Sequence, residues 1–84
     1  MEEKIDAVIK KLRRLFSFGI YKGVIETDPE VTLCKVDGKW EIYSIRFAFY
    51  DVISVGYSGV WYSPEHGDSE QLLSFKGFDD FLSI

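Results

Sequence analysis

The only histidine of the chain, His66, lies among three carboxylates, and this group is the first candidate for acid–base or metal chemistry. Glu65, Asp68 and Glu70 are its neighbours in a short stretch rich in turn-forming residues. A metal site needs ligands that converge from different elements, and a general base needs a placed partner. A cluster within one loop supplies neither. We therefore predict a solvated loop over residues 63–68, with no metal site and no catalytic site.

Cys34 is the only cysteine, so thiol chemistry would depend on it alone. The sequence places no partner beside it, and no serine has the context of a nucleophile elbow. The glycines are scattered, and none begins a helix with the spacing of a phosphate-binding loop. We predict a protein that is not an enzyme and needs no cofactor.

Four basic residues close the first helical segment and could bind a phosphate backbone: Lys10, Lys11, Arg13 and Arg14. Cations at a helix C-terminus ordinarily complement the helix dipole on a solvated face. The net charge of −4 also argues against the broad basic footprint that duplex nucleic acid requires. A small nucleic-acid-binding regulator that uses this end of the helix is the alternative function.

Aromatic residues are the most informative feature of the composition, with two Trp, five Tyr and seven Phe. A single small core cannot bury them all, and Tyr and Trp are enriched at protein interfaces. We expect Tyr21, Tyr43, Tyr57 and one of Trp61 or Tyr62 on the sheet face away from the first helix. In the alternative arrangement, a C-terminal helix covers that second face.

Charge is divided unevenly along the chain. Residues 47–84 contain one basic side chain against six acidic ones, whereas residues 1–46 contain nine basic and eight acidic. Acidic residues beside exposed aromatics would complement a basic partner, such as a nucleic-acid-binding protein. The predicted partner-binding residues are Tyr21, Tyr43, Tyr57, Trp61, Tyr62, Asp51, Asp79 and Asp80.

A helix must open the chain, because the apolar residues of its first 16 positions share one helical stripe. Acidic residues precede this stripe and basic residues end it, and Gly19 is expected to stop the helix. The stripe is formed by Ile5, Val8, Ile9, Leu12, Leu15 and Phe16.

Strands are expected to follow. Residues 18–25 alternate like a strand, with apolar side chains on both faces. Asp37-Gly38 predicts a type I′ hairpin between residues 31–36 and 39–45. The apolar parity changes after Ser44, which indicates a bulge or break between Tyr43 and Arg46. Helical spacing also fits residues 42–53, but their aromatic and β-branched side chains favour a strand.

The remaining sequence predicts one strand over residues 52–62, a further strand over 71–75, a break at Gly77 and a short helix over 78–82. The predicted fold is therefore α+β: an N-terminal amphipathic helix on a four- to five-stranded, mainly antiparallel sheet, with a short C-terminal helix. At 84 residues we expect a single domain, 1–84.

Compartment and function follow as expectations. A lone cysteine excludes an internal disulfide, and the charged N-terminal stretch lacks the pattern of a signal peptide, so we expect the cytoplasm, including that of an infected host cell. No unbroken apolar run is long enough for a membrane helix. We expect a non-catalytic protein-binding module, an inhibitor or antagonist of the phage or mobile-element type, that binds another protein or itself as a homodimer.

Overall fold

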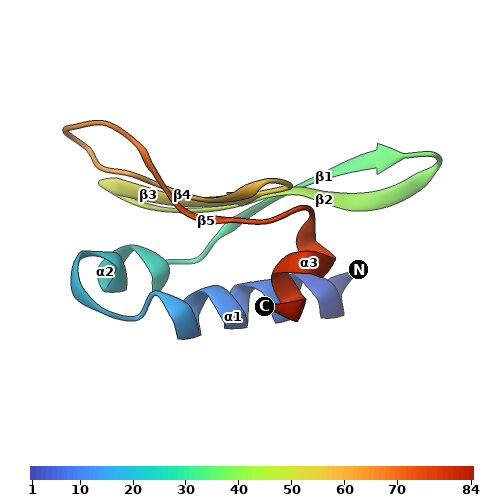
Figure 1. Ribbon diagram of the computed structural model, residues 1–84, viewed down its shortest axis with the longest axis horizontal. Coiled ribbons are helices and arrows are strands. Elements are labelled where there is room, and N and C mark those ends of the chain that lie inside the picture. The colour runs from blue at the N-terminus through green and yellow to red at the C-terminus, as the bar shows by residue number, and fades with distance from the viewer.

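The computed structural model describes residues 1–84 and contains a helical layer beneath one antiparallel sheet (Figure 1). Two helical segments follow the first helix before the sheet begins, and one more closes the chain. The elements, in chain order, are α1 (Glu2–Leu15), the 3₁₀ turn η1 (Gly19–Tyr21), α2 (Lys22–Ile25), β1 (Glu30–Val36), β2 (Lys39–Phe49), β3 (Asp51–Gly56), β4 (Gly59–Ser63), β5 (Glu70–Ser74) and α3 (Phe78–Ser83). The α+β fold that we predicted is confirmed.

The first helix, α1, buries the apolar stripe expected from its sequence. Val8 and Leu12 are fully buried, and Phe16 lies just beyond the last turn with 8% of its surface exposed. Glu2 and Glu3 occupy the first turn, and basic residues occupy the last, so the helix dipole is complemented at both ends.

The strand predicted over residues 18–25 is wrong, because this segment forms η1 and α2. Gly19 has a positive φ of 53°, which turns the chain away from an extended path. The helical turn then brings Val24 and Ile25, which are neighbours in sequence, into the core together, at 3% and 0% exposure. A strand would have pointed these two side chains to opposite faces.

The first hairpin is confirmed. Asp37 and Gly38 have φ values of 52° and 79°, the positive pair that a type I′ turn requires. Lys35 pairs with Trp40 across the two strands, as the predicted register demands. Farther along, the pairing shifts between Thr32 and Leu33 and leaves an extra residue, Tyr43, in β2. This bulge explains the change of parity, and residues 42–49 continue as strand.

The single strand predicted over residues 52–62 is wrong, because the chain turns at Tyr57 and Ser58 to form a β3–β4 hairpin. Gly59 is required where β4 meets β5, since a Cβ there would lie 2.3 Å from the backbone oxygen of Leu73. The loop over 63–68, the strand β5 and the terminal helix α3 agree with the predictions. The sheet is a meander of order β1-β2-β3-β4-β5.

All helices lie on one side of the sheet, so its other side is uncovered (Figure 1). Helix α3 packs beside α1 in the same layer, and the arrangement in which it would cover the second face is not found. The core between the layers contains 15 buried apolar residues, among them Phe47 and Phe81 at 0% exposure. None of the helices combines the length and apolar character that a membrane crossing requires.

Candidate protein-binding face

The candidate site is the side of the sheet turned away from the helices, which we call the open face. Strand residues alternate between the two sides, so Ile53 and Val55 point to the core and Ser54 between them points outward. The register places Ser54 beside Arg46 on one neighbouring strand and beside Trp61 on the other. The open face is thus assembled from every strand of the meander.

A shallow hollow of about 640 Å³ occupies the open face. Aromatic rings stand at its margins: Tyr43 from the bulge in β2, Tyr57 from the β3–β4 turn and Trp61 from β4. Between them lie small residues, including Ser54 and Gly56. Tyr43 and Tyr57 expose 64% and 71% of their surface, so a partner could contact both rings without rearrangement of the chain.

Charge on the open face is sparse and balanced. Glu30 pairs across the strands with Arg46, and Lys39 lies two positions before Glu41, so two acidic and two basic side chains share this side of β1 and β2. The outward residues of β3, β4 and β5 carry no charge. None of the four charged residues forms an ion pair within the chain, whose one salt bridge joins Lys4 to Asp79.

The structure divides the predicted aromatic residues between the two sides of the sheet. Tyr43, Tyr57 and Trp61 line the open face, as expected. Tyr21 and Tyr62 do not: their rings meet edge to face on the helical side, with centroids 5.1 Å apart. The prediction for Tyr21 is wrong because η1 is helical and carries the ring beneath the sheet. Of the pair Trp61 and Tyr62, it is Trp61 that faces outward.

Asp51, one of the predicted partner-binding residues, already accepts hydrogen bonds within the fold. The Tyr62 hydroxyl donates to Asp51 Oδ2 at 2.5 Å, and the backbone N–H of Glu65 donates to Oδ1 at 2.8 Å. The bond from Tyr62, followed by that from Glu65, lowers the pKa of Asp51 from its ordinary 3.8. The same bond, reinforced by burial, raises the pKa of Tyr62 to about 12. This carboxylate secures the β4–β5 loop.

Asp79 and Asp80 lie in the first turn of α3, in the helical layer. Asp79 forms a 2.8 Å ion pair with Lys4, and Asp80 accepts a 2.8 Å hydrogen bond from the backbone N–H of Lys76. Both remain exposed, but they are not on the open face. The acidic residues and the outward aromatics therefore do not form the single combined surface that we expected.

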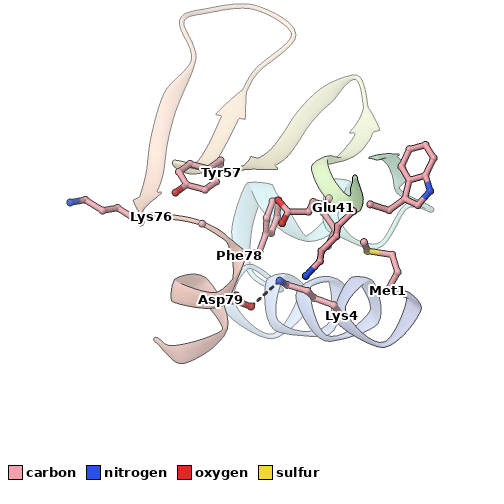
Figure 2. A pocket seen from close by; sticks show the side chains of 11 residues that line it. Met1, Lys4, Glu41, Tyr57, Lys76, Phe78 and Asp79 are labelled. Carbon is pink, nitrogen blue, oxygen red and sulfur yellow. Dashed lines mark ion pairs between the residues drawn. The ribbon is translucent and has the colours of Figure 1, made fainter. Parts of the chain in front are cut away.

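Tyr57 connects the open face to a second hollow, of about 420 Å³, where the first turn of α1 approaches α3 (Figure 2). The backbone N–H of Gly77 donates to the carbonyl of Tyr57 at 2.6 Å, and a Cβ at Gly77 would lie 3.2 Å from the ring. These contacts fix the position of Tyr57. Lys39 and Glu41 of β2 also line this hollow, and its Lys4 is already paired with Asp79 (Figure 2).

The basic end of α1 is largely committed to the fold, contrary to our expectation of a solvated face. Lys11 is 6% exposed and donates to the carbonyls of Phe81 and Ile84, at 2.7 and 2.5 Å. Arg13 donates to the carbonyls of Ile25 and Thr27, at 3.1 Å each. Lys10 and Arg14 are the two that stay exposed. Half of the predicted cationic surface is thus unavailable to a phosphate backbone.

His66 is exposed in the loop over residues 63–68. No group of three or more histidine, cysteine or acidic residues is arranged to hold a metal ion. Cys34 is half-buried at the margin of the larger hollow.

The sequence argument missed three residues of the open face, namely Arg46, Ser54 and Gly56. Their signal is strand parity, which becomes readable only when the Tyr43 bulge and the β3–β4 turn are placed correctly.

No family model, curated protein or solved structure matches the chain.

Proposed function

We propose that this protein is a non-catalytic binding module that acts by stoichiometric association with another protein. The observation that carries the proposal is the open face, where Tyr43, Tyr57 and Trp61 surround a hollow of about 640 Å³ on one side of a complete sheet. Aromatic side chains in a desolvated pocket supply most of the binding energy of many interfaces. The proposed target is a larger protein that this chain inhibits or antagonises, as small phage or mobile-element proteins do.

The chemistry of the face supports a protein partner over a nucleic acid. Its four charged residues sum to zero, and β3 to β5 contribute only neutral side chains to it. Protein interfaces are depleted of charge at their centre and enriched in Tyr and Trp, whereas nucleic-acid interfaces are strongly basic. The place of action that we propose is the cytoplasm, including that of an infected host cell.

The test is affinity capture from the cells in which the protein naturally occurs. The wild-type chain should recover one larger protein in a fixed ratio, and Tyr43→Ala or Trp61→Ala should weaken that complex by at least tenfold, about 1.4 kcal/mol. Tyr50→Ala is the matched control, because Tyr50 is 76% exposed but lies at the β2–β3 turn. Equal recovery by all four proteins, or recovery of no specific partner, would reject the proposal.

A further inference from the structure

The open face runs along the longest dimension of the molecule, which measures 39 × 22 × 22 Å (Figure 1). It is widest near Ile45 and Arg46, where β1 and β3 both pair with β2. Sheets can pack face to face about 10 Å apart when the side chains between them interlock. The occupant must therefore match this face in shape and charge.

The charges of the open face are complementary to themselves. Glu41 and Arg46 stand on either side of the bulge in β2, and the cross-strand partners of these two residues are Cys34 and Glu30. Thr32, midway between those partners on β1, pairs with Ser44 of β2. A two-fold axis that crosses the strands along this line would place Glu41 over Arg46 of the partner subunit, and Arg46 over the partner's Glu41.

We propose that the free protein covers its open face with a second copy of itself, related by this two-fold axis. The inference rests on the proposed function, since it identifies the partner that the same face binds when no target is present. The axis brings Glu30 over the partner's Cys34 and Lys39 over the partner's Ala48, so no two like charges lie directly over each other. An isologous interface of this kind repeats each favourable ion pair twice.

The same axis continues across the sheet through small residues. Ser44 is level with Gly56, which pairs with Gly59, which in turn pairs with Ser74. Gly59 is explained by its contact with β5, but Gly56 has only one atom within 4 Å of its Cβ position, at 3.9 Å, and no positive φ. A glycine that the fold does not require leaves space on the open face, into which side chains of a second sheet can fit.

Trp61 is also brought close to the partner in this arrangement. It lies two positions from Gly59 on one side of the axis, and the Tyr57–Ser58 turn begins one position from Gly56 and Gly59 on the other side. Trp61 of each copy is therefore placed over the β3–β4 turn of the partner. A target protein that binds the same face must displace the second copy, so the dimer is the resting form of the binding module.

Charge exchange tests the proposed axis. Sedimentation equilibrium over a wide concentration range should show a monomer–dimer equilibrium for the wild-type chain. Glu41→Arg and Arg46→Glu should each weaken the dimer by more than about tenfold, because like charges then face each other twice. The double variant Glu41→Arg/Arg46→Glu should restore dimerisation. Arg14→Glu, on an exposed part of α1, is the control and should leave the equilibrium unchanged.

Gly56→Thr provides a second test, since it should block the approach of the second sheet while the monomer keeps its circular dichroism spectrum and unfolding midpoint. A strictly monomeric wild-type protein would overturn the inference, and so would a dimer insensitive to both single charge reversals. These results are distinct from failure of the proposed function. A monomer whose Trp61→Ala variant loses a specific target keeps the function and rejects the second copy. A charge-swappable dimer without any target does the reverse.

Discussion

At the scale of single residues, the hydrogen bond between Tyr62 and Asp51 holds the end of the sheet where β3 begins and β4 ends. It joins the first residue of β3 to the buried ring of β4, and Asp51 also accepts the backbone N–H of Glu65. The bond exists only while Tyr62 is protonated and is strongest while Asp51 is ionised. Its contribution to stability is therefore bounded by pH on both sides.

We predict stability losses at both pH extremes that Tyr62→Phe largely removes. Folding lowers the pKa of Asp51 below 3.8, so its contribution is present above that value and is lost as pH falls through the folded-state pKa. Folding raises the pKa of Tyr62 from 10.0 to about 12, so its contribution is present below pH 10 and is lost as pH rises through about 12. Denaturant unfolding at a series of pH values measures both limbs.

Phenolate absorbance provides an independent check of the same bond. The wild-type protein should contain a tyrosine that titrates at about pH 12, and Tyr62→Phe should lack it. Tyr50→Phe, at an exposed position without a side-chain hydrogen bond, should retain it. If the titration curve of Tyr62→Phe loses a tyrosine of ordinary pKa instead, the bond does not persist in solution.

At the scale of elements, the short helix α2 depends on one side chain from α1. Arg13 donates to the carbonyls of Ile25 and Thr27, which lie at and beyond the end of α2, and its guanidinium is 5.9 Å from the centre of the Phe47 ring. A helix of four residues has too few internal bonds to be stable alone. Capping of its terminal carbonyls by an arginine stabilises it.

We predict that Arg13→Ala lowers the free energy of unfolding by about 1–3 kcal/mol, because it removes charged hydrogen bonds to two backbone acceptors. From the sequence alone, Arg13 would be assigned to a solvated face with little effect on stability. Its neighbour Arg14 is exposed, and Arg14→Ala should cost under ~0.5 kcal/mol. Chemical denaturation of the two variants decides, and equal losses would contradict the capping role.

The elements that could be predicted from sequence are those with local signals. The Asp37-Gly38 turn is specified by two residues that tolerate positive φ, and α1 by an unbroken apolar stripe. The β3–β4 turn has no such signal, since neither Tyr57 nor Ser58 has a positive φ. Helix α2 was missed for another reason: burial of Val24 and Ile25 together is decided by packing against the sheet, not by local pattern.

The candidate site was predicted in part for the same reasons. Tyr43 was placed on the outward side because strand parity after the Asp37-Gly38 turn is clear, whereas the choice between Trp61 and Tyr62 stayed open until the β3–β4 turn was known. Tyr21 was placed on the wrong side because the helical segments η1 and α2 were predicted as a strand. That Glu41 and Arg46 lie on the same face, on either side of the bulge, could be seen only from the observed register. Residue types indicated an interface, while its outline required the pairing of strands that are distant in sequence.

At the scale of the whole molecule, Lys11 joins the helical layer from its first element to its last. Its ammonium group donates to two carbonyls at the end of α3 and lies 5.3 Å from the centre of the Phe81 ring. Helix α3 is only six residues long, so this contact and the burial of Phe78 and Phe81 hold it in place. If α3 detached, the core beneath β5 would be opened to solvent.

We predict that Lys11→Met, which keeps the apolar stem but removes the ammonium group, lowers the free energy of unfolding by about 1–3 kcal/mol. The loss should be concentrated at the C-terminal end, where the amides of Phe81 and Ile84 should exchange with solvent faster while those of β2 and β3 are less affected. Hydrogen exchange followed residue by residue measures this distribution. Lys10→Met is the matched control, because Lys10 is the exposed neighbour and should leave both stability and exchange nearly unchanged. Uniformly faster exchange across the sheet and the helices would mean instead that Lys11 stabilises the core as a whole. Unchanged exchange at Phe81 and Ile84 would show that α3 does not depend on the hydrogen bonds from Lys11.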